Sequence, residues 1–442
     1  MMTLRSTLFR HSPLSLVFAF VACVPDGQAK EAFRHVAKLE MSNAFRLTSS
    51  DWKIPERTAL LGVDGLFGLE ITNWTKGDFT TAISNLTEII RITPNDAMAY
   101  IRRGICHSLQ SEPDKAIADF KKATRVDPNN GLAHFFLGIS HFEQREFERA
   151  ITDITEALRL IPKKIMVRSR TASATLYSMR GYAYLATGAY ERAVSDLTEA
   201  IKIDSRDDSF YCDRGTAYDR KGEFVKAMKD YDEAIRINPT NLVAYYNRGC
   251  IGQERGELDS AIRDFTRAIQ IDPTNVDSYY NRSVAFSDKG ALDKAIADLN
   301  EAIRLEPHNG TFYCDRGHVF SRKEEWTKAR ADYSEAIRVD PNNADAHNEL
   351  AWLLATSPDA SVRNGVRAIA IAKRACELAE WKNPNHIGTL AAANAEAGDF
   401  EEAVKYQKQV LSSTVLNKTE RSDETQRLEL FQQRKPYRDE AK

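Results

Sequence analysis

The sequence predicts an all-α protein, an α-solenoid superhelix of about ten helix–turn–helix units with terminal cap helices. Three observations predict this fold class. One pattern of small and apolar residues returns every 34 residues, apolar side chains within each copy fall at helical spacing, and a proline closes most copies. The chain has 442 residues, of which 43% are hydrophobic and 28% charged, a composition typical of soluble proteins.

The first 29 residues differ from the rest and predict a secretory signal peptide. Arg5 and Arg10 precede an apolar run, Leu14 to Cys23, that is too short to cross a bilayer as a helix but fits the apolar region of a signal. We therefore expect cleavage before Lys30, export to the periplasm or envelope, and no membrane span in the mature chain. Two alternatives stay open: a lipoprotein acylated at Cys23, and a cytoplasmic protein with an apolar N-terminus.

Residues 30–60 predict an N-terminal helix and a linker. Phe33, Val36 and Phe45 indicate a short amphipathic helix, and Pro55 lies in the linker. We place the repeat array over residues 61–414, and a C-terminal cap helix and tail over residues 415–442.

A ladder of small residues defines the array. Its anchor is an alanine that recurs at intervals of 34 residues, with one interval of 43, at Ala82, Ala116, Ala150, Ala193, Ala227, Ala261, Ala295 and Ala329. Other small residues keep a fixed distance from the anchor: glycine stands twelve residues before most anchors, and a second alanine stands seven after nearly all of them. Such regularity indicates helix pairs that approach each other closely and stack in a line.

One copy shows why each residue is needed. Apolar residues predict one helix over residues 209–220 and a second over residues 223–237, with Gly222 breaking the chain between them. Pro239 ends the second helix because it has no N–H to donate and biases the preceding residue away from helix. Gly215 costs roughly 0.5–1 kcal/mol inside a helix relative to alanine, so its recurrence requires a packing advantage.

This pattern resembles the tetratricopeptide repeat family. The residues that carry the resemblance in one copy are Tyr211, Gly215, Tyr218, Ala227, Tyr231, Ala234 and Pro239. It covers about residues 61–415, and the closing block Ala375–His386 resembles one found in bacterial, planctomycete-like members with many repeats. The resemblance implies a right-handed superhelix whose first helices line a concave groove, and it implies that Gly215 faces Ala227.

Two charged positions recur as regularly as the small ones. Arginine precedes the glycine position in six copies, at Arg103, Arg180, Arg214, Arg248, Arg282 and Arg316. Aspartate stands three residues after the anchor, at Asp119, Asp153, Asp196, Asp230, Asp264, Asp298 and Asp332. We predict a ladder of Arg–Asp pairs between neighbouring helices. A track for a charged ligand is the alternative.

Two insertions interrupt the rhythm. Nine extra residues lie within Ile161–Ser178, where we expect a solvated loop or a lengthened helix; an acidic partner bound by its basic residues is the alternative. The second insertion, within Glu349–Gly365, moves the next anchor to Ala368.

The resemblance implies a non-catalytic scaffold that binds a protein, a peptide or a partner helix in the groove. By register, the candidate groove residues are Tyr246, Asn247, Cys250, Tyr280, Asn281, Cys212, Asp213, Asp219, Asp315, His318 and Trp352. The Tyr–Asn pairs of two adjacent repeats are the strongest candidates, because an amide can bond a peptide backbone and tyrosine adds apolar area. Recent duplication of the repeats would also explain these pairs.

Other classes of function are disfavoured. The formal net charge of −2 argues against nucleic acid, since such partners need a basic face. The six cysteines stand singly, with neither metal-ligand spacing nor a disulfide framework, and we predict no cofactor and no metal site. The alternative to a scaffold is a regulatory or self-associating subunit of a larger enzyme or envelope complex. We expect a monomer, because the caps cover both ends of the array.

Overall fold

The computed structural model describes residues 78–161 and 170–439. The predicted signal peptide (1–29), the N-terminal helix and linker (30–60) and the start of the array lie outside these residues. Within them the chain forms helices and no strands, as the fold class predicts. The described residues divide into two compact units, one ending at Ala244 and one starting at Tyr245.

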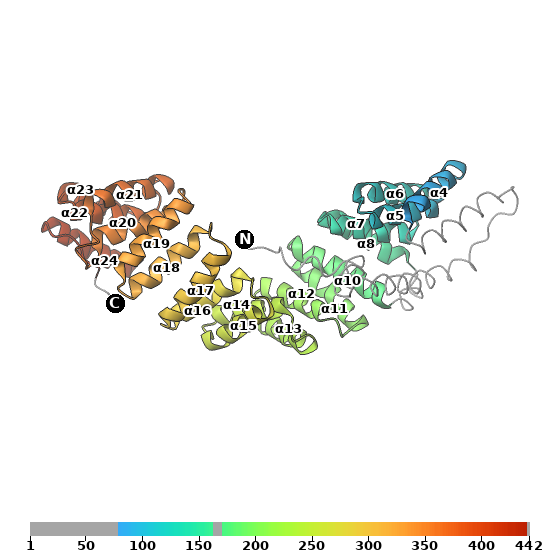
Figure 1. Cartoon of the computed structure of the whole chain (residues 1–442), viewed down its shortest axis with the longest axis horizontal. Helices are drawn as coiled ribbons and strands as arrows, with labels where there is room; N and C mark the ends of the chain where they lie inside the picture. Colours follow the sequence, from blue (N-terminus) through green and yellow to red (C-terminus); the bar gives the residue numbers. More distant parts are fainter. Residues whose placement is uncertain (1–77, 162–169, 440–442) are drawn as a thin grey trace. The chain divides into compact units, whose positions relative to one another are not determined.

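The first unit is built from helices that pack consecutively (Figure 1). These helices are α4 (Phe79–Ile92), α5 (Ala97–Leu109), α6 (Pro113–Val126), α7 (Gly131–Glu143), α8 (Phe147–Leu160), α10 (Arg170–Ala186), α11 (Tyr190–Ile203), α12 (Asp208–Arg220) and α13 (Phe224–Ile237). Helix α10 has 17 residues where its counterparts have 13, so the lengthened helix predicted at the first insertion is present.

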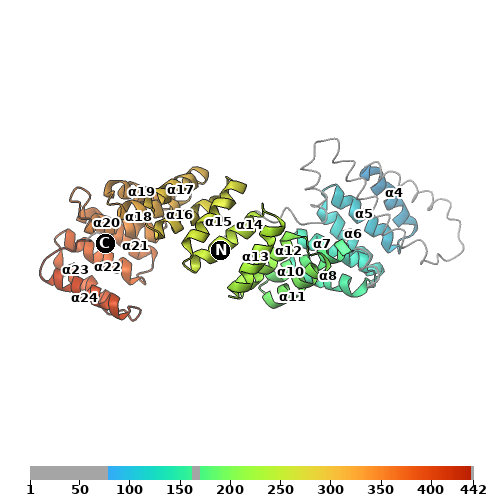
Figure 2. The same ribbon diagram turned by 90° about the horizontal axis from the view of Figure 1, so that it is seen from below.

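The second unit continues the same order from α14, whose first residues end the first unit (Figure 2). Its helices are α14 (Leu242–Glu254), α15 (Leu258–Ile271), α16 (Val276–Asp288), α17 (Leu292–Leu305), α18 (Gly310–Arg322), α19 (Trp326–Val339), α20 (Ala344–Thr356), α21 (Gly365–Leu378), α22 (Pro384–Glu396), α23 (Phe400–Leu411) and α24 (Lys418–Gln432).

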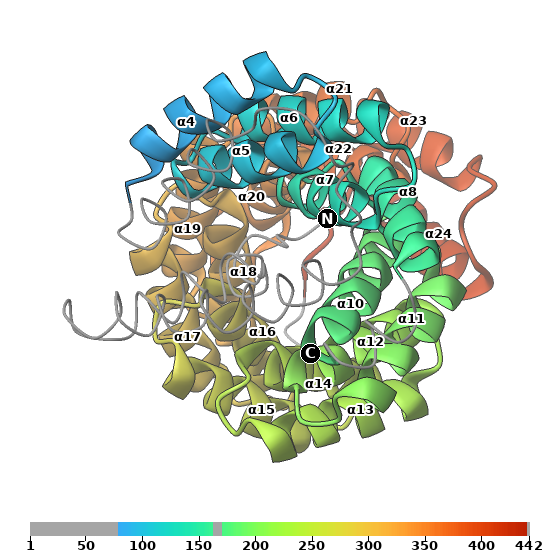
Figure 3. The ribbon, with the colours of Figure 1, turned by 90° about the vertical axis from the view of Figure 1, so that its right-hand side faces the viewer.

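Helices pair as the sequence predicts. In each unit the first helices of successive pairs form one layer and the second helices the other, as α10 and α12 against α11 and α13 show (Figure 3). The Asp207 carboxylate caps α12 by accepting from the backbone N–H of Ser209 at 3.0 Å. Gly222 makes the turn to α13 with φ of +76°, a conformation that glycine adopts without strain.

The alanine ladder forms the interior. All eight anchor alanines from Ala82 to Ala329 are fully buried, and so is Ala368, the anchor displaced by the second insertion. Gly215 lies against the second helix of its own pair: a Cβ there would lie 2.8 Å from Tyr231 Cε1 and 3.3 Å from the Ala227 carbonyl oxygen. The close approach expected at Gly215 is therefore confirmed, and it explains why a residue unfavourable in helices is used.

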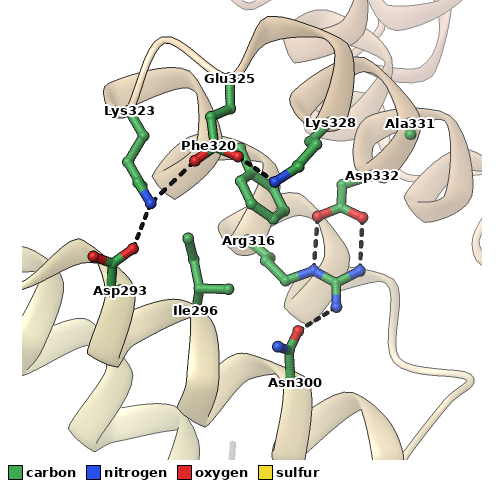
Figure 4. Close-up of a pocket in the computed structure, with 10 residues that line it drawn as sticks. All are labelled: Asp293, Ile296, Asn300, Arg316, Phe320, Lys323, Glu325, Lys328, Ala331 and Asp332. Atoms are coloured by element: carbon green, nitrogen blue, oxygen red, sulfur yellow. Dashed lines mark hydrogen bonds and ion pairs between the residues drawn. The ribbon is translucent and has the colours of Figure 1, made fainter.

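The predicted Arg–Asp ladder is also present. Each of the six arginines donates from Nε and Nη2 to the two carboxylate oxygens of the aspartate 16 residues later, at 2.6 to 2.9 Å. The Nη1 group of Arg316 also donates to Asn300 of α17, at 2.6 Å (Figure 4). Thr87, Thr155, Thr198 and Thr266 accept from ladder arginines in the same way. The ladder is therefore structural, and each such arginine joins three helices.

One repeat departs from the ladder. Leu137 occupies the arginine position on α7, and Asp153 of α8 contacts two histidines instead. The Asp153 carboxylate lies 2.8 Å from His141 Nδ1 and 3.4 Å from His134 Nδ1. This partly buried carboxylate thus keeps polar partners although the usual arginine is missing.

Candidate peptide-binding surface

In the second unit, side-chain contacts join each first helix to the next. Asn281 of α16 donates from Nδ2 to the Tyr246 hydroxyl of α14 at 3.0 Å. Tyr280 of α16 hydrogen-bonds Asp315 of α18. His318 of α18 lies 3.1 Å from Glu349 of α20, measured from Nε2 to Oε2. His386 Nε2 of α22 lies 3.2 Å from Asp345 Oδ1 of α20. We call this row of first helices, α14 to α22, the first-helix surface.

The two predicted Tyr–Asn pairs contact each other in the structure. Asn281 of the second pair bonds Tyr246 of the first pair. Besides its bond to Tyr246, Asn281 Nδ2 donates to the Asp277 carbonyl at 2.8 Å, so both amide hydrogens are used within the chain. Tyr246 also packs on the Phe265 ring and hydrogen-bonds Cys250, and burial raises the pKa of its hydroxyl. Asn247, the other asparagine of the pairs, is partly buried. Asn281 therefore serves first to link two repeats.

A polar hollow of about 380 Å³ opens on the first-helix surface between α18, α20 and α22. Every lining residue except Cys314 is polar. Two of the predicted residues, Asp315 and His318, line it from α18, and Asn348 and Glu349 line it from α20. The sequence candidates of the second unit are thus partly brought together at one site.

Helix caps place the polar groups at the mouth of this hollow. Asn343 accepts from the Ala346 backbone N–H at 2.9 Å at the start of α20. Asn383 accepts from the Asn385 N–H at 3.0 Å at the start of α22, where Pro384 occupies the first helical turn. These lining residues are fixed by the need to satisfy backbone donors at two helix starts.

The electrostatics of the hollow are unusual. Burial raises the pKa of Asp315, and the hydrogen bond from Tyr280 only partly offsets this. Burial by itself lowers the pKa of His318, but the hydrogen bonds to Cys314 and Glu349 outweigh it and raise the pKa above its ordinary value. His318 is therefore protonated near neutral pH and pairs with the Glu349 carboxylate.

The three predicted residues of the first unit lie together on α12. Cys212 is buried, and burial raises the pKa of its thiol well above the usual value. Burial, together with the charges of Asp207 and Asp208, raises the pKa of Asp213 to about 7. Asp219 lies near the end of the same helix and is partly buried.

Trp352, the last of the predicted groove residues, contacts the end of the chain. It belongs to the first-helix surface on α20, but the end of the chain covers it. Its indole N–H donates to Asp439 Oδ2 at 2.8 Å, and its ring lies 5.7 Å from that of Tyr437, between centroids. The Arg427 guanidinium stands 4.9 Å from both ring centroids. The surface predicted to bind a partner at Trp352 is occupied by the tail that follows α24.

Sequence reasoning identified Asp315 and His318 among the residues that line the hollow and missed the others, which include Asp345, Asn348, Glu349 and His386. A signal existed for Asn348 and Glu349, because they occupy on α20 the positions that Tyr280 and Asn281 occupy on α16. Asp345 aligns with Asp277, which was not a candidate. His386 had no such signal, since it contacts Asp345 across the second insertion and 41 residues of sequence.

Within residues 78–161 and 170–439, no group of three or more His, Cys, Asp or Glu side chains is arranged to hold a metal ion. None of the helices in these ranges combines the length and apolar character that a bilayer crossing needs.

Family profiles match the chain at several repeats. Profiles described as tetratricopeptide repeat match residues 97–130, 209–241 and 276–309, and one described as TPR repeat matches residues 181–222, 254–290 and 319–356. A comparison with curated proteins finds no match.

A comparison with solved structures returns matches that include three proteins. They are YrrB, described as a TPR protein with an unusual peptide-binding site (20% identity, 44% of this chain and 95% of that one, TM-score 0.38); the C-terminal part of a TPR repeat-containing protein from Cytophaga hutchinsonii (17%, 57% and 99%, 0.48); and yeast Tom70 (16%, 92% and 97%, 0.39). The recurring helix pairs, the buried ladder of alanines and the family profiles together show that the chain is a tetratricopeptide repeat protein, a class whose members mediate protein–protein interactions.

Proposed function

We propose that this protein is a non-catalytic scaffold that binds an extended segment of a partner protein on the first-helix surface of its second unit. The observation that carries the proposal is the polar hollow between α18, α20 and α22. A segment bound in extended form presents free backbone N–H and C=O groups. The polar side chains on three adjacent helices can form hydrogen bonds with these groups.

The charge of the surface supports a peptide over nucleic acid. Asp315, Asp345 and Glu349 line the hollow, and a phosphate backbone would be repelled by these carboxylates. The peptide contacts differ from those expected at Tyr246 and Asn281, whose polar groups bond each other. We therefore place the main contacts nearer the C-terminal repeats.

Site-directed photo-crosslinking in the source cell tests the proposal. A photoreactive residue replaces Thr311 or Asn385, two exposed residues at the hollow, in the full chain. A matched control carries it at Arg338, an exposed position on the second helix α19. Mass spectrometry should find the same partner segment crosslinked from both hollow positions and not from the control. Crosslinks of equal yield at all three positions, or none at the hollow, would reject the proposal.

We also propose export through the N-terminal signal. N-terminal sequencing of the protein purified from fractionated cells should find Lys30 as the first residue, in the periplasmic or envelope fraction. An intact Met1 in the cytoplasmic fraction would reject it.

A further inference from the structure

We propose that the polar hollow binds a basic side chain, an arginine or a lysine, carried by the partner segment. The inference rests on the proposed function, because it names the chemistry of the group that enters the site. Three independent features of the hollow lead to it: its charge, its buried hydrogen-bond acceptors, and the contrast with the Arg–Asp ladder beside it.

The hollow is acidic and lacks a matching cation. Three carboxylates line it, from Asp315, Asp345 and Glu349, while no lysine or arginine of the described residues does so. The protonated imidazole of His318 is committed to Glu349 at 3.1 Å. Asp315 has a hydroxyl partner, Tyr280, and faces no arginine or lysine within the hollow. An entering cation would therefore find uncompensated negative charge.

Two buried acceptors at this site have no donor among the described residues. Asp315 Oδ2 and Asn348 Oδ1 are buried and accept no hydrogen bond within the part of the chain that the structure describes. The amide group of Asn348 donates from Nδ2 to its neighbour Glu349 at 3.2 Å. Buried acceptors without a donor are costly, and a ligand that supplies donors would satisfy them.

A buried histidine adds a third unused polar atom. His386 lines the hollow, is only 3% exposed, and its Nδ1 has no partner among the described residues. In the tautomer that donates from Nε2 to Asp345, Nδ1 is an acceptor. Lysine and arginine carry only donors, three and five respectively, whereas a carboxylate ligand would bring further acceptors and be repelled.

The chain shows how its other buried aspartates are satisfied. Asp332 accepts two hydrogen bonds from Arg316, the residue that follows Asp315 in sequence. Because Arg316 is directed toward α19, it is not available to Asp315. Asp315 therefore has no ladder arginine of its own among the described residues, and a guanidinium or ammonium group that enters the hollow would give it a cationic partner.

The test uses the full-length protein labelled with ¹³C and ¹⁵N at histidine and capped amino acids as probes. N-acetyl-arginine-N-methylamide and its lysine counterpart should shift the imidazole signals of His318 and His386 in NMR spectra. The citrulline analogue, which matches arginine in shape without its charge, should bind at least about tenfold more weakly. Raising the salt from about 0.05 to 0.5 M should weaken the binding of the basic probes.

Two variants and a matched control complete the test. Asp315→Asn and Asn348→Ala each remove one acceptor and should reduce the arginine response at least about tenfold. Asp213→Asn is the control, because Asp213 occupies the same hexapeptide, FYCDRG, at residues 210–215 that Asp315 occupies at residues 312–317. It should leave the response unchanged.

Equal binding of the citrulline and arginine probes, or an unchanged response in both hollow variants, would overturn the inference. The outcome is separable from that of the proposed function. If a partner segment crosslinks at the hollow but the basic probes do not bind, the scaffold function stands and this inference fails. If the probes bind but nothing crosslinks, the basic-side-chain site stands and the scaffold function fails.

Discussion

Arg316 of α18 and Asp332 of α19 form a two-point ion pair inside one repeat: Nη2 lies 2.7 Å from Oδ1, and Nε lies 2.8 Å from Oδ2. Their side chains are 19% and 9% exposed. The pair is therefore part of the interface between the two helices, unlike the many exposed pairs along the second helices.

Replacing Arg316 with alanine should destabilise the protein by about 3 kcal/mol, because it leaves the buried Asp332 carboxylate without its partner. Urea unfolding of the variant and the wild type measures the change. The matched control is Arg338→Ala, which breaks an exposed pair with Glu335 on the same second helix and should cost less than about 1 kcal/mol. Equal costs for the two changes would mean that the ladder contributes no more than surface pairs.

Gly215→Ala should lower stability by about 1–3 kcal/mol although alanine is the better helix former. The added methyl would lie 2.8 Å from the ring of Tyr231, which is fully buried and cannot move aside easily. Gly388→Ala is the control, since a Cβ there meets no other atom closer than 3.8 Å. Thermal unfolding should show a lower midpoint for the first variant and an unchanged or higher one for the second. A stabilised Gly215→Ala would show that the helices of this pair do not pack as described.

The stability of the protein should fall as the pH rises from about 4 to about 7 through Asp213. Its pKa is raised from 3.8 to about 7 in the folded state, so the unfolded chain loses this proton first and deprotonation favours unfolding. Asp213→Asn should remove this component and be more stable than the wild type at pH 7.5, by at least about 1 kcal/mol after allowance for partial exposure. Melting curves at several pH values measure the difference. Parallel pH profiles for the two proteins would contradict the raised pKa.

Removal of the tail should expose Trp352. Tyr437 packs on its ring and Asp439 accepts from its indole N–H, so a chain ending at Arg434 should show red-shifted tryptophan emission and stronger acrylamide quenching. Trp352→Phe in the same truncated chain should abolish the change, which assigns it to this tryptophan. We expect a loss of about 1–2 kcal/mol of stability, since partly buried aromatic contacts are lost. An unchanged spectrum after truncation would show that the tail does not cover Trp352 in solution.

Much of the fold could be predicted from the sequence because a stacked array repeats each physical requirement at a fixed interval. Ala227 must be small to admit the facing helix, and Asp230 must follow it to meet Arg214; six copies carry both features. The sequence placed Asp315 and His318 on the first-helix surface by the same register.

Contacts that do not follow the register could not be predicted. His386 lies 41 residues from its partner Asp345, because the second insertion lengthens the interval between their helices, and the 34-residue period does not predict this contact. The tail meets Trp352 across 87 residues, and no periodic signal connects Trp352 to Asp439. Asn281 was expected to bond a peptide, but hydrogen-bond satisfaction within the protein uses its amide hydrogens first.

The arginine ladder also bears on how the molecule comes apart. Arg282 bonds Asp298 of its own helix pair and Thr266 of the preceding pair. The hydrogen bonds of one guanidinium therefore connect two successive hairpins. Opening the α16–α17 hairpin would remove the donor that the Thr266 hydroxyl accepts from, although the ion pair of each neighbouring hairpin stays intact. Because these bonds couple successive hairpins, amide protons on both sides should exchange together. Local unfolding should start at the outermost helices, because fewer of these hydrogen bonds between hairpins have to break there.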